Sequence, residues 1–121
     1  MSVAVALDQL AEQLDSLGPR AFLITVGADS TSHVVSVLVR AEGEELLAEV
    51  GRRSRANLVS NPRATLLWPP VADGPYSLIV DGTVDPRAGD LVAVRPERAV
   101  LHRIAGGDTD LPTCVPLEGR E

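Results

Sequence analysis

The sequence is poor in aromatic residues and contains a single cysteine. Phe22, Trp68 and Tyr76 are its three aromatic residues, so the core of a folded domain must be built from aliphatic side chains. Cys114 has no second cysteine to pair with, which excludes an intramolecular disulfide scaffold and indicates a reducing compartment. With 121 residues, of which 45% are hydrophobic and 23% charged, the chain has the length and composition of one globular domain.

Lysine is missing altogether, and the charge balance is acidic. All 11 basic side chains are arginine, against 17 acidic ones, which gives a formal net charge of −6. This balance argues against a general nucleic-acid binder, whose surface would be broadly basic. Long apolar runs are also missing, since the longest charge-free segment, Ser30 to Val39, is too short to cross a bilayer as a helix. We therefore expect a cytoplasmic protein that binds neither nucleic acid nor membrane.

The spacing of apolar residues predicts one helix followed by six strands. Leucines at three- and four-residue steps predict a helix that ends at Gly18. Segments rich in β-forming residues follow, separated by turn residues, and a short helix interrupts them after the third strand. We expect Ser54 to cap this inserted helix and Pro62 to end it. The predicted strands are 21–26, 32–41, 46–50, 63–68, 76–84 and 91–104.

Strands joined by such short turns favour a closed antiparallel barrel over a parallel sheet, whose crossovers need more residues. We expect a single domain over residues 1–121, with its core from about 20 to 104 and an irregular tail over 105–121. Gly82 is expected to mark a β-bulge, and Pro96 to bend or divide the last strand. In the second strand, Val34 and Leu38 alternate with Val35, Val37 and Val39, which predicts that both faces of this strand are covered.

The segment GRRSRANLVSNPR, from Gly51 to Arg63, concentrates positive charge in this acidic chain. A helix N-terminus presents unpaired backbone N–H groups and a partial positive charge, and neighbouring guanidinium groups can bind phosphate oxygens in pairs. The candidate phosphate-binding residues are Arg52, Arg53, Ser54 and Arg55. The alternative is a solvated helix face whose arginines pair with surface acids, each pair contributing ~0–1 kcal/mol.

The order of elements and this segment resemble the pyridoxamine-phosphate oxidase-like, flavin-binding split-barrel family. The residues that match the family pattern are Gly51, Arg53, Leu58, Asn61, Pro62, Arg63, Leu66 and Leu67. The resemblance implies a mainly β fold, a six-stranded antiparallel split barrel with an N-terminal helix and a short inserted helix. It also implies a homodimer that holds FMN, or in some branches a deazaflavin coenzyme, between its subunits, with Arg53 on the coenzyme phosphate.

The sequence departs from the family pattern at several positions. Ser54 stands where the family commonly has lysine, and Leu47 and Ala48 stand where it has tyrosine and threonine. Ser32 and Val37 occupy positions where oxidase members carry arginine and lysine. These departures leave an alternative open, in which the barrel has lost its coenzyme and acts as a binding or interaction module.

No catalytic residue and no metal site is predicted. His33 and His102 lack the convergent ligands of a metal centre, and Asp81 and Asp85 are expected to be exposed strand acids. Trp68 is expected to anchor the core or a dimer interface, with stacking on a flavin ring as the alternative.

The functional hypothesis is an FMN-binding oxidoreductase-like protein that transfers electrons to an unidentified small molecule. A deazaflavin-dependent reductase is the variant of this hypothesis. In either case the coenzyme carries the electrons, and the protein binds and orients it. We expect a homodimer because short strands leave edges and an apolar rim, to which Leu66, Leu67 and Trp68 would contribute.

Overall fold

The computed structural model describes residues 7–71, 74–103 and 114–116. Its helices are α1 (Leu7–Leu17) and α2 (Arg52–Ser60). Its strands are β1 (Arg20–Val26), β2 (Ser32–Glu42), β3 (Glu45–Glu49), β4 (Arg63–Trp68), β5 (Ser77–Pro86), β6 (Leu91–His102) and β7 (Cys114–Pro116). In the described residues, no helix is long and apolar enough to cross a membrane.

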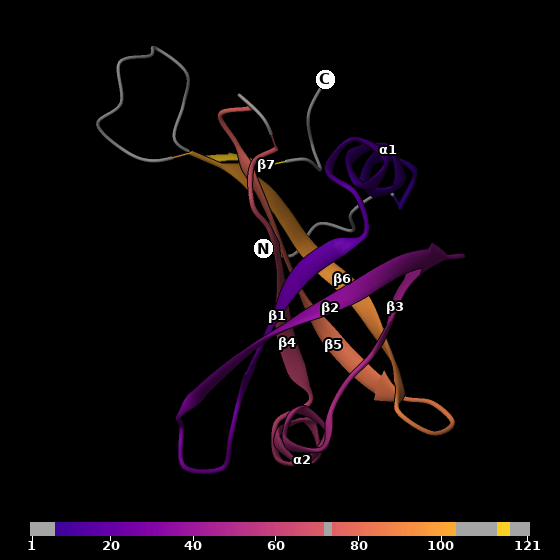
Figure 1. The fold of residues 1–121 in the computed structure, drawn as a ribbon, viewed down its shortest axis with the longest axis vertical. Coiled ribbons are helices and arrows are strands. Elements are labelled where there is room, and N and C mark those ends of the chain that lie inside the picture. Colours follow the sequence, from indigo (N-terminus) through magenta and orange to yellow (C-terminus); the bar gives the residue numbers. More distant parts are fainter. Residues whose placement is uncertain (1–6, 72–73, 104–113, 117–121) are drawn as a thin grey trace.

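Strands β1 to β6 form a closed antiparallel barrel, as the sequence predicts. They hydrogen-bond in the order β3-β2-β1-β4-β5-β6, and the pairing of β3 with β6 closes the sheet on itself. Figure 1 shows α1 and α2 at opposite ends of the barrel along its long axis. The mainly β fold with one N-terminal and one inserted helix is therefore confirmed.

The core of the barrel is aliphatic around one tryptophan. Trp68 is 0% exposed, and its indole N–H donates a hydrogen bond to the carbonyl oxygen of Gly18 over 3.1 Å. Leu10 of α1 is buried, and Leu14 and Leu17 pack against the same core, so α1 closes this end of the barrel. Trp68 thus anchors the core, and in this structure it offers no surface on which a flavin ring could stack.

The expected β-bulge lies in the antiparallel pairing of β5 with β6. Asp81 pairs with Arg98 and Gly82 pairs with Pro96, which leaves Glu97 as the extra residue of β6. A Cβ atom on Gly82 would lie 2.3 Å from the carbonyl oxygen of Arg95, so this close approach requires glycine. The bulge at Gly82 is confirmed, and β6 continues through Pro96 as one strand from Leu91 to His102.

Two sequence-based expectations about local structure are wrong. Helix α2 begins at Arg52 with Gly51 as its N-cap residue, and Ser54 lies buried in its first turn without a capping role. In β2, Val34 is 55% and Leu38 is 64% exposed, so the described residues leave its outer face uncovered. Alternating apolar residues in a strand therefore did not mean that both faces were covered within one chain.

Of the tail predicted to be irregular, residues 105–121, the structure describes only residues 114–116. Cys114–Pro116 forms the short strand β7, which pairs antiparallel with the end of β6 and was not expected from the sequence. The rest of the tail, residues 105–113 and 117–121, lies outside the described residues.

Candidate functional site

Helix α2 lies at one end of the barrel, between the β1–β2 turn and the β5–β6 turn (Figure 1). On the first side, the Asn57 amide donates a hydrogen bond to the Thr25 hydroxyl over 3.0 Å. On the second side, Arg55 pairs with Asp90, and the backbone N–H of Val50 donates to the Asp90 carbonyl oxygen over 3.0 Å. The helix that carries the candidate phosphate-binding residues is therefore fixed between two turns that are distant in sequence.

Helical geometry separates the four candidate residues onto different faces of α2. Successive residues are about 100° apart around a helix axis, so four consecutive side chains cannot form one cluster. Ser54 is 1% exposed and faces the core. Arg55 pairs with Asp90, and Arg52, three residues earlier on the same face, lines a hollow together with Arg55 and Asp90. Arg53 alone among them acts electrostatically on Asp29, in the β1–β2 turn.

Asp29 was not singled out by sequence analysis and is the acidic neighbour of Arg53. The pKa of Asp29 is lowered, chiefly by the hydrogen bond from the Thr31 backbone N–H (3.0 Å) and in smaller part by the positive charge of Arg53. Asp29 is therefore a carboxylate at neutral pH. It attracts the Arg53 guanidinium and would compete with any anion that binds there.

The N-terminus of α2 has no side-chain cap. The N–H of Arg55 donates to the Gly51 carbonyl oxygen over 3.0 Å, so the amides of Arg52, Arg53 and Ser54 precede the first intrahelical hydrogen bond. No acidic residue lies in the first turn to neutralise the partial positive charge of the helix end. This arrangement can bind an anion through backbone amides and one exposed arginine side chain.

Three of the residues at the departures from the family pattern, Leu47, Ala48 and Val37, have buried apolar side chains. Ala48 is 2% exposed and belongs to the core cluster, whereas Leu47, 6% exposed, lies on the other face of β3 opposite Ala93 of β6. Val37 is likewise buried, at 6%. These three side chains therefore contribute no polar contact to a phosphate.

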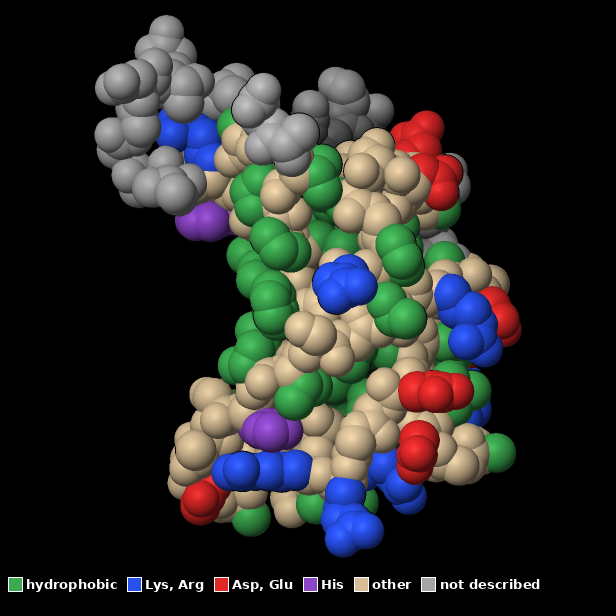
Figure 2. Space-filling model, in the orientation of Figure 1, with side chains coloured by type: hydrophobic (Ala, Val, Ile, Leu, Met, Phe, Trp, Pro, Cys, Tyr) green, Lys and Arg blue, Asp and Glu red, His purple; other side chains and the backbone are tan. Residues whose placement is uncertain are grey.

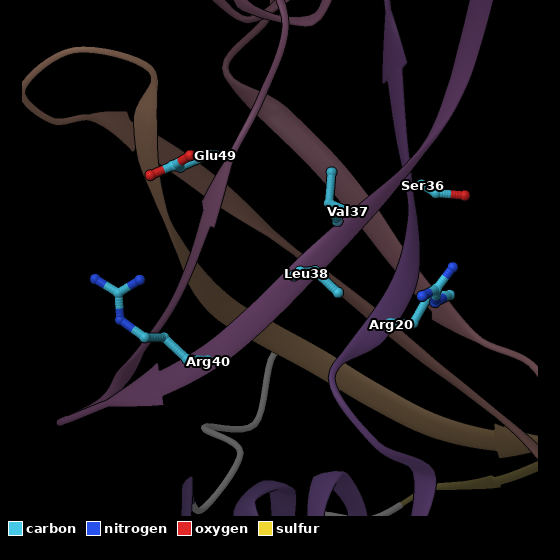
Figure 3. A pocket seen from close by; sticks show the side chains of 6 residues that line it. All are labelled: Arg20, Ser36, Val37, Leu38, Arg40 and Glu49. Carbon is cyan, nitrogen blue, oxygen red and sulfur yellow. The ribbon is translucent and has the colours of Figure 1, made fainter.

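A second hollow of about 560 Å³ lies on the outer face of β2. Figure 3 shows Ser36, Leu38 and Arg40 along β2, with Arg20 of β1 and Glu49 of β3 beside them. Arg40 also pairs with Glu42 over 2.9 Å. Sequence analysis missed this hollow because Arg20 comes opposite Leu38, two residues before Arg40, only through the pairing of β1 with β2.

The strand acids considered in the sequence are engaged in surface interactions. Asp81 accepts a hydrogen bond from the Thr65 hydroxyl over 2.6 Å, and Asp85 pairs with Arg95 over 3.1 Å. Within the described parts of the chain, no group of three or more histidine, cysteine, aspartate or glutamate residues is placed to hold a metal ion.

Solved structures share this architecture. An F420 reductase superposes with a TM-score of 0.60 at 20% identity, over 70% of this chain and 94% of the other. HupZ of Group A Streptococcus has a TM-score of 0.64 at 13% identity, over 76% and 93% of the two chains. A heme binding protein from Mycobacterium smegmatis has a TM-score of 0.62 at 15% identity, over 87% of this chain and 57% of the other. The protein therefore shares the barrel fold of these structures.

Two curated sequences define the family more closely. The chain is 39% identical over 127 residues to the uncharacterized protein Mb0449c of Mycobacterium bovis and, equally, to the uncharacterized protein MT0457 of Mycobacterium tuberculosis. The alignment covers 92% of this chain and 87% of each relative. The chain belongs to the same family as these two mycobacterial proteins. No protein-family model matches it.

Proposed function

We propose that this protein binds a phosphorylated coenzyme of the flavin type, either the deazaflavin F420 or FMN, and serves as an oxidoreductase. The observation that carries the proposal is the uncapped N-terminus of α2 with the exposed Arg53 beside it. Backbone amides and a guanidinium group at a helix N-terminus favour phosphate oxygens. The F420 reductase of the same fold supports the deazaflavin, and the family resemblance of the Gly51–Arg63 segment supports FMN equally.

The four candidate residues take different parts in this proposal. Arg53 and the first amides of α2 would hold the phosphate, and Asp29 would keep the Arg53 side chain near the β1–β2 turn until the anion displaces it. Ser54 would contribute its backbone N–H, since its side chain is buried. Arg52 and Arg55 lie toward the β5–β6 turn and would not contact the phosphate. The bound coenzyme would supply the redox chemistry, while the protein binds and orients it.

The homodimer is part of the same proposal, and of the residues named in the sequence it keeps only Leu67, which is half-buried opposite Phe22. Leu66 and Trp68 are 0% exposed and belong to the core. Phe22, Val34 and Leu38 are instead 38%, 55% and 64% exposed. Figure 2 shows hydrophobic side chains gathered along a hollowed flank of the molecule. We propose that a second copy covers the exposed residues of β1 and β2, since apolar patches on a protein surface mark interaction sites.

The test is a fluorescence titration of the purified full-length protein with F420 and, separately, with FMN. We expect saturable binding of at least one coenzyme at micromolar protein. Arg53→Ala should weaken it about 10- to 100-fold, because charge-assisted hydrogen bonds contribute about 1.5–3 kcal/mol. Arg52→Ala is the matched control, since it removes the same charge from the same helical turn on the other flank, and it should change the affinity less than about threefold.

Two results would contradict the proposal. The absence of saturable binding for both coenzymes would favour the alternative of a cofactor-free interaction module. Equal effects of Arg53→Ala and Arg52→Ala would show that the overall charge of α2, and no local phosphate contact, governs binding.

A further inference from the structure

The flank of α2 that faces the β5–β6 turn is hollowed into a groove with one polar and one apolar end. Two adjoining hollows share Arg55 and Val59 and together form this groove. The polar part measures about 580 Å³ and is lined by Arg52, Arg55, Ala56, Val59 and Asp90. The apolar part measures about 370 Å³, and its apolar lining includes Leu58, Pro62, Val84, Pro86, Leu91 and Val92.

The apolar end has a base of buried side chains and is open to solvent at its rim. Val84 and Val92 are 5% and 4% exposed and form its floor, and the Val84 N–H already donates to the Pro62 carbonyl oxygen over 2.9 Å. Val59, at its rim, is 86% exposed although it is a large apolar residue. The floor therefore offers apolar contact without an unsatisfied backbone donor at Val84, and Val59 would lose exposed apolar surface if a ligand entered.

The polar end has one positive charge in excess. Arg55 is neutralised by Asp90, and Arg87, at the apolar end, donates two hydrogen bonds of 2.7 Å to the Glu45 carboxylate. Arg52 forms no ion pair with any part of the chain that the structure describes. An anionic group at this end would therefore meet an uncompensated guanidinium with Arg55 beside it.

We propose that this groove binds a medium-chain fatty acid, with its carboxylate at Arg52 and its alkyl chain between α2 and the β5–β6 turn. The volume of the apolar part falls within the roughly 300–1,000 Å³ of small-molecule sites. Because a helix rises about 1.5 Å per residue, Arg52 and Val59 are about 10 Å apart along the axis of α2. That span suits an elongated acid such as decanoate and is too long for acetate. The groove lies on the flank of α2 opposite Arg53, so this inference is independent of the coenzyme proposal.

The test is a calorimetric titration of the full-length protein with sodium decanoate. We expect one saturable site per chain, with decanol and acetate each binding at least tenfold more weakly, because one lacks the charge and the other the chain. Val59→Glu places a carboxylate at the rim and should weaken decanoate binding at least tenfold. Val71→Glu introduces the same change at another exposed valine outside the groove and should leave the affinity within about twofold.

Arg52→Glu provides a second variant at an exposed position, and it should also weaken decanoate binding at least tenfold. Failure of decanoate to saturate, or equal losses in Val59→Glu and Val71→Glu, would overturn the proposal. It would also be overturned if light scattering showed that Val59→Glu dissociates a dimer, since the groove would then be covered by a second copy. Decanoate binding without coenzyme binding would support this site while the coenzyme proposal fails, so the two outcomes are distinguishable.

Discussion

Arg53 and Arg55 are two positions apart in α2 and act on different turns of the barrel. The pKa of Asp29 in the β1–β2 turn is lowered chiefly by hydrogen bonds from Thr31 and in smaller part by Arg53, whereas Arg55 pairs with Asp90 beside the β5–β6 turn. A basic segment that looks like one cluster in the sequence is therefore two separate positive regions in the fold. This separation allows each region to be tested with substitutions that leave the other intact.

Asp29→Asn should strengthen coenzyme binding. The substitution removes a carboxylate that attracts Arg53 and repels phosphate, so we expect an increase in affinity. Asp90→Asn is the matched control on the other flank and should have no such effect. Fluorescence titration measures both, and a loss of affinity in Asp29→Asn would contradict the assignment.

Asp29 should also contribute to the dependence of stability on pH. The pKa of Asp29 is lowered in the folded protein from its ordinary value of 3.8, chiefly by the Thr31 backbone N–H. A carboxyl with a depressed folded-state pKa stabilises the protein above its unfolded-state pKa, and this contribution is lost as pH falls below 3.8 through the folded-state value. Carboxyl chemical shifts recorded by NMR against pH give the value directly. A midpoint at or above 3.8 would contradict the hydrogen bond from Thr31.

Gly82→Ala should destabilise the barrel. The added methyl group would lie 2.3 Å from the Arg95 carbonyl oxygen, and the resulting displacement of β6 should reduce the free energy of unfolding by about 1–3 kcal/mol. Gly51→Ala is the control, because nothing lies within 4 Å of a Cβ atom there, and it should lose about 1 kcal/mol or less as an N-cap change. Urea denaturation measures the free energy of unfolding of both variants. An equal decrease in the two would show that β6 accommodates the added methyl group and that the bulge does not require glycine.

Val34→Asp should disrupt the proposed homodimer without unfolding the chain. Val34 is 55% exposed, so a charge there is tolerated in a single copy but would be desolvated in an apolar interface. We expect light scattering to change from dimer to monomer while the circular dichroism spectrum stays unchanged. A wild-type protein that is monomeric at high concentration would exclude this interface.

The six barrel strands and their succession along the chain could be predicted from the sequence because turn residues interrupt segments of β-forming residues, and because Gly51 and Pro62 bound the inserted helix. Their pairing order in the sheet and the strand β7 were not predicted. The burial of Ser54 could not be predicted, because a serine in the first turn of a helix looks like a cap until the barrel beneath it is known. The exposure of Val34 and Leu38 could not be predicted either. Alternating apolar residues form the same sequence pattern whether the chain itself or another molecule covers them. Helical geometry already places Arg53 and Arg55 on different faces, but which turn each face meets depends on how the closed sheet arranges the turns around α2.

The most direct test of the central proposal follows the amide resonances of α2 by NMR while F420 or FMN is added to isotopically labelled protein. If the phosphate binds at the uncapped helix end, the amides of Arg53 and Ser54 should show the largest shifts, and Arg53→Ala should abolish them at the same coenzyme concentration. Shifts confined to other parts of the barrel, with the first turn of α2 unchanged, would contradict the account.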